Sequence, residues 1–214
     1  VSPGKFIPLA ERTGLILEIG GWVLCQACKE TKAIQDETGK DLAIGVNLSP
    51  QQFKDEELIE KVDYALAESG LAPEDLTLEI TESIIMENIK KSVEILVELK
   101  ERGINISVDD FGTGYSSLNY LSSFPLDELK IDRSFIMDIP EDKEKVSISK
   151  AVINLAHALN LGVIAEGAET YQQIKFLKEN DCEKIQGYYY SKPVPKKDIL
   201  HFLEDKNDFE GGVK

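Results

Sequence analysis

Two adjacent carboxylates, Asp109 and Asp110, are the residues of this sequence whose types and spacing point most directly to chemistry. They follow the apolar run 103–108, which has the pattern of a buried strand. Two carboxylates held side by side repel each other unless a cation lies between them. The glycines and small hydroxyl residues of 112–117 then form a loop that can approach a ligand closely. Because Asp-Asp before Gly is also ordinary turn chemistry, the pair alone leaves a turn and a ligand site both open.

Ligand-type side chains recur where the other predicted strands end. In chain order they are Asn47, Glu79, Glu82, Asp109, Asp110, Lys130, Asp132, Glu166, Glu169 and Gln186. Each has an ordinary explanation when taken alone, but the same kind of residue at six strand ends indicates one shared site. Oxygen ligands without His or Cys favour Mg²⁺ or Mn²⁺, and several converging carboxylates have room for two metal ions. Together with a lysine that can orient water or neutralise phosphate, these residues predict a metal-dependent phosphoryl-type hydrolase.

Short apolar runs and longer amphipathic segments alternate along the chain. We expect strands at 42–48, 76–80, 104–108, 128–131, 162–165 and 184–188. We expect helices at 50–69, 88–102, 115–123, 142–160, 170–180 and 195–204, and 17–34 also has a helical pattern. Strict alternation implies right-handed crossovers and a parallel α/β sheet.

Two architectures compete for such a sheet, an open doubly wound sheet and a TIM-like (β/α) barrel. The glycine-rich dinucleotide fingerprint is absent after the first strand, which disfavours the open sheet. Polar residues at every strand end suit the carboxyl-terminal rim of a barrel. A closed barrel has eight strand–helix units, so with six units here we expect the remaining two upstream of Val1.

The composition narrows the classes of function. The chain of 214 residues has 39 Asp and Glu against 24 Lys and Arg, a net charge of −15. Such a balance argues against binding a nucleic-acid polymer through a basic surface. Apolar runs stay shorter than the roughly 20 residues of a membrane span, so we expect no membrane contact by this domain. Three cysteines make a disulfide framework unexpected and favour a cytoplasmic setting.

The cysteines and histidines are not expected to carry chemistry. Cys25 and Cys28 have the spacing of a zinc or redox pair, but they lie in a helical pattern without a second Cys or His pair nearby. We interpret both as small core residues. His157 and His201 are expected to be structural or solvated.

The motifs together resemble those of the EAL domain family, bacterial phosphodiesterases that hydrolyse cyclic di-GMP to linear pGpG. The segments that carry the resemblance are 2–11, Asn47-Leu-Ser-Pro50, Glu79-Ile-Thr-Glu82, Asp109–Ser117, Lys130-Ile-Asp132, Ala165–Thr170 and Gln186–Pro193. The resemblance extends to about Leu203. It implies an EAL domain at 1–204, followed by a polar tail at 205–214.

The resemblance also implies roles for the polar strand ends. The implied ligands of two Mg²⁺ or Mn²⁺ ions, with Asp109 bridging both, are Asn47, Glu79, Asp109 and Asp110. Glu166 and Lys130 would lie beside the attacking water or the phosphate. Supporting roles are implied for Glu82, Asp132, Glu169 and Gln186; Gln186 would help position the site. Glu82 would anchor the loop Asp109–Ser117, through which family members couple dimerisation to metal binding.

One departure is large: the Glu-Ala-Leu triplet that names the family is absent. The resemblance begins just downstream of the strand that would carry this triplet, so we expect an N-terminally truncated barrel. Without that glutamate the chain is expected to be weakly active or inactive alone.

Two other classes of function stay open beside the enzyme. One is a cyclic di-GMP receptor that binds without turnover, and the other is a protein-interaction module. The resemblance further implies a homodimer and fusion to sensory or diguanylate cyclase domains. It also implies that this domain lies in the cytoplasm, including the case in which the whole protein is anchored in a membrane.

Overall fold

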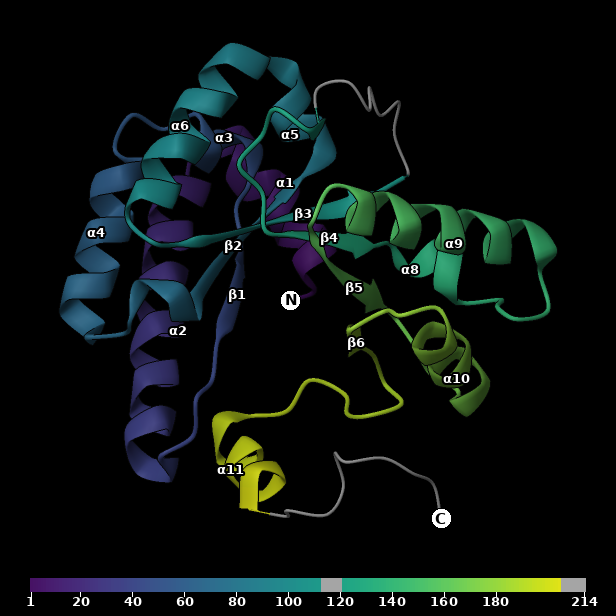
Figure 1. Cartoon of the computed structure of the whole chain (residues 1–214). Helices are drawn as coiled ribbons and strands as arrows, with labels where there is room; N and C mark the ends of the chain where they lie inside the picture. The colour runs from purple at the N-terminus through teal and green to yellow at the C-terminus, as the bar shows by residue number, and fades with distance from the viewer. Residues whose placement is uncertain (113–120, 205–214) are drawn as a thin grey trace.

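The computed structural model describes residues 1–112 and 121–204. Six parallel strands lie in the order β1-β2-β3-β4-β5-β6 and curve into a half-barrel (Figure 1). Their bounds are β1 Ile44–Asn47, β2 Leu76–Thr81, β3 Asn105–Phe111, β4 Glu128–Ile131, β5 Gly162–Glu166 and β6 Lys184–Gln186. Neighbours in the sheet are also neighbours along the chain, which is the order of successive strand–helix units in a barrel. The predicted α/β fold of the TIM-like barrel type, with six strand–helix units, is confirmed.

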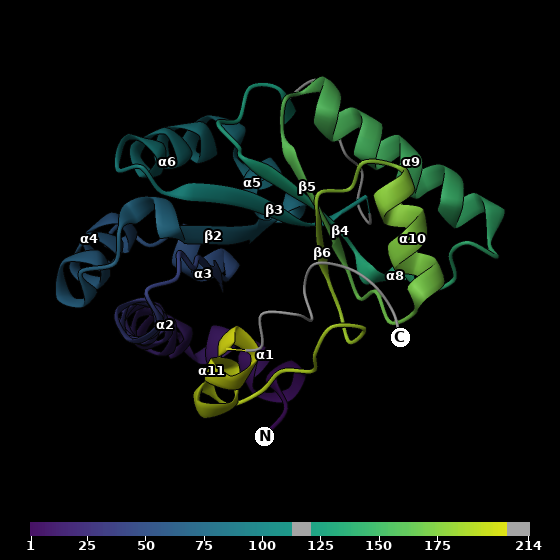
Figure 2. The same cartoon turned by 60° about the horizontal axis from the view of Figure 1, so that its bottom comes forward.

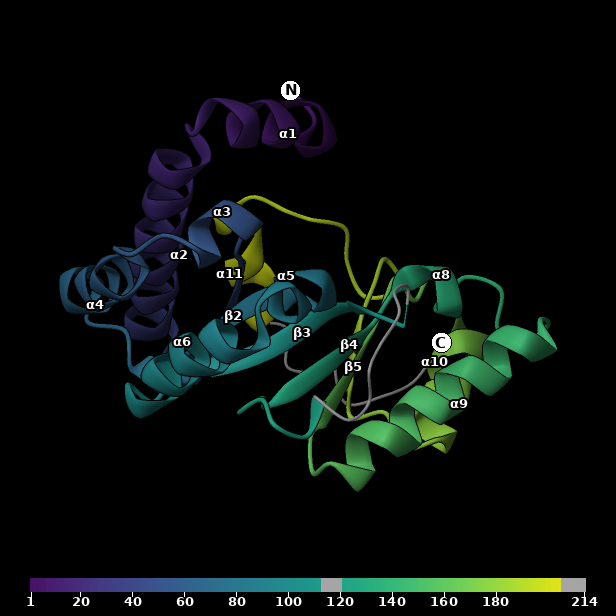
Figure 3. The ribbon, with the colours of Figure 1, turned by 90° about the horizontal axis from the view of Figure 1, so that it is seen from above.

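Helices follow the strands and cover the outer face of the sheet. The α-helices are α1 Pro3–Thr13, α2 Ile16–Thr38, α3 Pro50–Phe53, α4 Leu58–Ser69, α5 Glu82–Glu87, α6 Ile89–Glu101, α8 Arg133–Ile136, α9 Lys143–Ala158, α10 Tyr171–Glu179 and α11 Lys196–Glu204, and a 3₁₀ turn spans Pro73–Asp75. Helices α2 and α4 lie at one end of the sheet, and α9 and α10 lie at the other (Figures 1 and 3). Helix α11 returns to α2, where Lys196 forms an ion pair with Glu30 (Figure 2).

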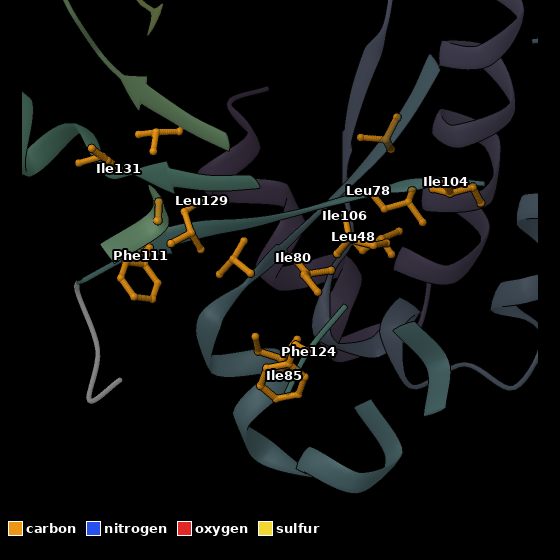
Figure 4. Close-up of a cluster of buried hydrophobic side chains, with 14 of the residues drawn as sticks. Leu48, Leu78, Ile80, Ile85, Ile104, Ile106, Phe111, Phe124, Leu129 and Ile131 are labelled. Atoms are coloured by element: carbon orange, nitrogen blue, oxygen red, sulfur yellow. The ribbon is translucent and has the colours of Figure 1, made fainter. Parts of the chain in front are cut away.

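The core lies between the strands and the outer helices. Along β2 the alternate residues Leu76, Leu78 and Ile80 are buried, while Glu79 between them faces the inside of the half-barrel. Figure 4 shows the same buried layer continuing through the neighbouring strands to Leu129. Because side chains alternate across a strand, burying one apolar row towards the helices turns the polar row inward.

The predicted single helix over 50–69 is wrong. Residues Pro50–Phe53 and Leu58–Ser69 form two helices separated by a turn at Asp55. The Asp55 carboxylate accepts the backbone N–H of Glu57 and holds an ion pair with Lys61. A side chain that hydrogen-bonds the local backbone in this way competes with helix continuation. The expected start at Ser49 is confirmed by a capping box, and Gly70 ends α4 with a φ of 69°.

The cysteines and histidines were expected to be structural or solvated. Cys28 is fully buried in α2 and Cys25 packs partly buried against the same core, as predicted. The Nε2 atom of His157 lies 3.5 Å from a carboxylate oxygen of Glu183. The side chain of His201, most of the expected helix 115–123 and the tail 205–214 lie outside the described residues. None of the helices in the described ranges has the length and hydropathy of a membrane span.

Candidate functional site

The polar strand ends meet at one edge of the half-barrel. Asn47 ends β1, Glu79 lies in β2, Asp109 in β3, Lys130 in β4, and Glu166 ends β5. The sheet register places Asn47 beside Glu79. Because all six strands are parallel, their carboxyl ends share this edge, and alternation turns these side chains inward. The structure therefore brings five of the predicted site residues together.

Lys130 is the centre of this group. Its Nζ atom lies 2.6 Å from Glu79 Oε2 and 2.6 Å from Glu166 Oε1. Asp109 Oδ1 lies 3.6 Å from the same ammonium. The Asn47 side-chain amide donates a hydrogen bond of 3.2 Å to Glu79 Oε2. Only 3% of the lysine side chain is exposed, so its charge depends on these carboxylates rather than on water.

The charges of this group do not cancel. Three carboxylates face one ammonium, which leaves an excess of two negative charges. Burial lowers the pKa of Lys130. The hydrogen bonds with Glu166 and Glu79 and the charges of Glu79 and Asp109 outweigh this effect, so the pKa is raised overall and the ammonium keeps its proton. Burial raises the pKa of Glu166; the bond from Lys130 opposes this rise, and the charges of Asp109 and Glu79 add to it. The excess negative charge of the site would therefore be stabilised by an additional positive charge.

Asp109 and Asp110 lie in a β-bulge, not at the start of a loop as predicted. Between Val108 and Phe111 two residues of β3 stand opposite one residue of β4. In a regular strand the two carboxylates would point to opposite faces. Asp110 instead has a φ of 56°, and its backbone N–H donates to Asp109 Oδ1 at 2.9 Å. The bulge therefore redirects the second carboxylate of the pair.

The bulge leaves Asp110 in a strongly negative environment. Partial burial raises the pKa of Asp110, and the charges of Asp109 and Asp132 raise it further, while Lys130 lowers it. Asp132 itself starts α8, where its carboxylate accepts the backbone N–H of Ser134 at 3.0 Å. Asp110 and Asp132 thus belong electrostatically to the same edge of the sheet.

A second group of predicted residues lines a cleft of about 580 Å³ beside the lysine centre. Glu169 forms an ion pair of 2.7 Å with Arg133, and Gln186 is the register neighbour of Glu166. Gly167 has a φ of 71°, and a Cβ atom there would overlap the Arg133 side chain. Glu169 and Gln186 therefore lie in the cleft rather than around Lys130.

Glu82 stands apart from both groups. It is the first residue of α5, it is 7% exposed, and its Oε2 atom has no hydrogen-bond partner among the residues that the structure describes. Its predicted partner is the loop Asp109–Ser117, of which 113–117 lies outside the described residues.

The donor set suits a hard divalent cation. Across 1–112 and 121–204, no group of three or more His, Cys, Asp or Glu side chains is arranged to hold a metal ion as it stands. The oxygen donors of Asn47, Glu79 and Asp109 nevertheless have the chemistry that Mg²⁺ and Mn²⁺ prefer. The excess negative charge around Lys130 also favours a cation, because a positive charge stabilises neighbouring carboxylates.

Several residues in or behind the cleft were not predicted from the sequence. Arg133, Tyr188 and Lys192 line the cleft, and Gln173 lies behind it, bonded to Ile136. Arg133 directly follows a polar strand end, and the sequence Thr170-x-x-Gln173 is a capping-box pattern, so both carried a readable signal. The ammonium of Lys192 lies 5.7 Å from the centre of the Tyr188 ring, a contact that spacing alone does not reveal.

Comparisons with known proteins identify one family. The sequence profile described as EAL domain matches residues 1–193. The chain is 44% identical over 203 residues to the cyclic di-GMP phosphodiesterase NbdA of Pseudomonas aeruginosa, covering 95% of this chain and 26% of NbdA. It is also 44% identical over 200 residues to the bifunctional diguanylate cyclase/cyclic di-GMP phosphodiesterase MucR of the same species, covering 94% of this chain and 29% of MucR. The chain thus spans about a quarter of the length of these curated relatives.

Solved structures show the same fold. The structure of PaMucR phosphodiesterase in complex with c-di-GMP matches with a TM-score of 0.90 at 44% identity, covering 93% of this chain and 81% of that chain. The EAL domain of DcpA from Mycobacterium smegmatis matches with a TM-score of 0.82 at 37% identity, covering 87% of this chain and 84% of that chain.

Proposed function

The chain belongs to the EAL domain family, and from this premise we propose that it hydrolyses one phosphodiester bond of cyclic di-GMP to give linear pGpG. The observation that carries the proposal is the cluster of Glu79, Asp109 and Glu166 around the buried Lys130. Excess negative charge at the carboxyl ends of barrel strands suits a divalent cation that neutralises a phosphate diester. The relatives NbdA and MucR, which carry phosphodiesterase names, support the same reaction.

The proposed site depends on Mg²⁺ or Mn²⁺. The residues that would hold the cation are Asn47, Glu79, Asp109 and Asp110. When bound, the cation would neutralise phosphate charge and lower the pKa of water to give the nucleophile. Glu166 would accept a proton from the attacking water, and Lys130 would stabilise negative charge on the phosphate. Asn47 orients Glu79 through its side-chain amide.

The cleft beside the centre suits a guanine base of this substrate. Arg133 and Glu169 offer donors and an acceptor for the polar edges of a purine. Tyr188, which is 52% exposed, offers a ring for stacking. Glu166 lines the same cleft, so a base held there would lie next to the proposed reaction centre.

A direct assay tests the proposal. The purified chain is incubated with cyclic di-GMP and either Mn²⁺ or EDTA, and pGpG is followed by chromatography. We expect turnover with Mn²⁺ only, and Asp109→Asn should lower it by about 10²- to 10³-fold because a charged group of the site is lost. Asp36→Asn, which changes an exposed carboxylate of α2, is the matched control. Unchanged turnover in Asp109→Asn with bound metal verified would overturn the assignment.

A cyclic di-GMP receptor is the second candidate. The observation that supports it is the position of the Lys130 ammonium between the carboxylates of Glu79 and Glu166. A metal ion would have to compete with this ammonium for the two carboxylates. Binding of cyclic di-GMP with EDTA present, and no pGpG with Mn²⁺, would favour the receptor. A protein-interaction module that leaves the site unused would give neither result.

Several wider expectations remain predictions. They are one domain at 1–204 with a tail at 205–214, a homodimer, fused sensory or diguanylate cyclase domains, and a cytoplasmic location.

A further inference from the structure

Gln173 connects the two segments that form the walls of the cleft. It lies in the first turn of α10 and is 3% exposed. Its Oε1 atom accepts the backbone N–H groups of Glu169 at 2.7 Å and Thr170 at 2.9 Å. Its Nε2 atom donates to the backbone carbonyls of Ile136 at 3.1 Å and Met137 at 2.8 Å. All four hydrogen bonds that a side-chain amide offers here are therefore made within the protein.

The two sides of this amide reach different strand ends. The acceptor side holds the loop after β5, which carries Glu166 and Glu169. The donor side holds the carboxyl end of α8, which begins at Arg133 after β4. The last carbonyls of a helix lack partners within the helix and need donors from elsewhere. Gln173 supplies such donors and thereby fixes α8 relative to the loop after β5.

Helix capping alone does not account for a glutamine at this position. In a capping box, Glu serves as well as Gln, because only an acceptor for the backbone N–H of the first residues is required. The donors directed at Ile136 and Met137 are what distinguish Gln173 from a glutamate. The amide is thus required by the contact with α8.

On the other wall of the cleft, the loop after β5 is held by different bonds. Ala168 donates its backbone N–H to Gln186, and its carbonyl accepts the N–H of Tyr189. That side is joined by main-chain bonds, whereas the hydrogen bonds that join α8 to the loop after β5 come from one side-chain amide, beside the exposed ion pair of Arg133 with Glu169. A single substitution can therefore remove the hydrogen bonds on one wall of the cleft while leaving those on the other wall in place.

We propose that Gln173 is a positioning residue that sets the distance between Arg133 and Glu169 and so determines how well the cleft binds the base of its ligand. The inference rests on the proposed function for the identity of that ligand. Gln173 is not among the residues that line the cleft and acts through the two segments that it joins, which carry Arg133 and Glu169.

The test replaces the amide by a carboxylate of the same shape in the full 214-residue chain. Gln173→Glu keeps the capping acceptor and removes both donors to α8. We expect KM for cyclic di-GMP to rise about tenfold, the fold-change of a lost polar contact of ordinary strength, with kcat within about twofold. We also expect faster backbone hydrogen exchange in residues 134–137. Asn180→Asp is the matched control, because it makes the same change at the far end of α10, where Asn180 bonds Phe176.

The possible results separate the alternatives. A lower melting temperature with unchanged KM in Gln173→Glu would show a merely structural role and overturn the inference. If Gln173→Glu does not fold, Gln173→Met removes the bonds without burying a charge and is judged by the same KM criterion. If wild-type chain gives no turnover, the proposed function fails, and the dissociation constant of cyclic di-GMP replaces KM. Unchanged affinity together with unchanged hydrogen exchange in 134–137 would then refute the positioning role.

Discussion

The ammonium of Lys130 lies 2.6 Å from the carboxylate of Glu166 on the neighbouring strand, with 3% of the lysine side chain exposed. The same ammonium reaches across β3 to Glu79 on β2. Together with Asp109 on β3, these contacts let one buried cation link four strands of the half-barrel at the edge where the chemistry is proposed. Because each partner is charged and nearly enclosed, the stability of the sheet and the affinity for a metal ion should depend on each other.

Replacing Lys130 by methionine tests this dependence. Three carboxylates would then face one another without their counter-charge, and breaking a buried ion pair from one side typically costs about 3–5 kcal/mol. We expect the free energy of unfolding, measured with urea in EDTA, to fall by that order. Mn²⁺ should restore part of the loss, because a cation can replace the missing charge.

The exposed ion pair of Lys29 with Glu68 provides the control for this experiment. Lys29→Met should leave the unfolding free energy nearly unchanged, since water screens that pair. Equal effects of Lys130→Met and Lys29→Met would mean that the carboxylates at the strand ends do not need the ammonium.

The pH dependence of stability should report the same group. Hydrogen bonds with Glu166 and Glu79 outweigh burial and raise the pKa of Lys130 above its ordinary value. A raised folded pKa means that the folded chain binds the proton more tightly than the unfolded chain. The resulting stability is fully present below the ordinary lysine pKa of about 10.4 and is lost as the pH rises through the folded value.

The measurement compares wild type with Lys130→Met by urea unfolding across this range. The difference in unfolding free energy should stay constant from pH 7 to about pH 10 and shrink only above that. A difference that already shrinks between pH 7 and 9 would indicate a lowered pKa and contradict the assignment.

The sequence allowed the grouping of the polar strand ends to be predicted because strand geometry is simple. Parallel strands put their carboxyl ends at one edge, and alternation decides which side chains face inward. Asn47, Glu79 and Glu166 could therefore be grouped from their positions after apolar runs. What the pattern could not give is which side chain lies at the centre, since that depends on how far Lys130 reaches between strands.

Local irregularities were beyond the reach of pattern reasoning. The bulge at Asp109 and Asp110 adds one residue to β3, and no alternation rule indicates where a strand accepts an extra residue. The cleft was missed because Arg133 and Glu169 lie 36 residues apart along the chain and meet only through tertiary packing. Gln173 was missed for the same reason, although its capping-box spacing was visible.

Arg133→Met should separate the cleft from the reaction centre. The substitution removes the guanidinium that faces Glu169 and keeps much of the apolar side chain. A good polar contact to a base contributes about 1–3 kcal/mol, so we expect KM for cyclic di-GMP to rise about tenfold or more with kcat nearly unchanged. Arg102→Met removes an ion pair of the same length, between the end of α6 and Asp63 on α4, and should change neither constant. A loss confined to kcat would show that Arg133 acts in the chemical step and not in binding the base.

Gly187→Ala should damage the other wall of the cleft, where main-chain atoms leave no room for a side chain. A Cβ atom at position 187 would lie 2.0 Å from the carbonyl oxygen of Ala168 and 2.5 Å from its nitrogen, so backbone would have to move. Overpacking of this kind costs about 1–3 kcal/mol, and the shift should also break the bond from Tyr189 to Ala168. We expect a lower unfolding free energy in urea and weaker binding of cyclic di-GMP by calorimetry. Gly21→Ala in α2, where the nearest atom would be 3.9 Å away, should instead raise stability by about 0.5–1 kcal/mol. Equal stability changes in the two variants would show that the contact between Gly187 and Ala168 does not hold the loop after β5.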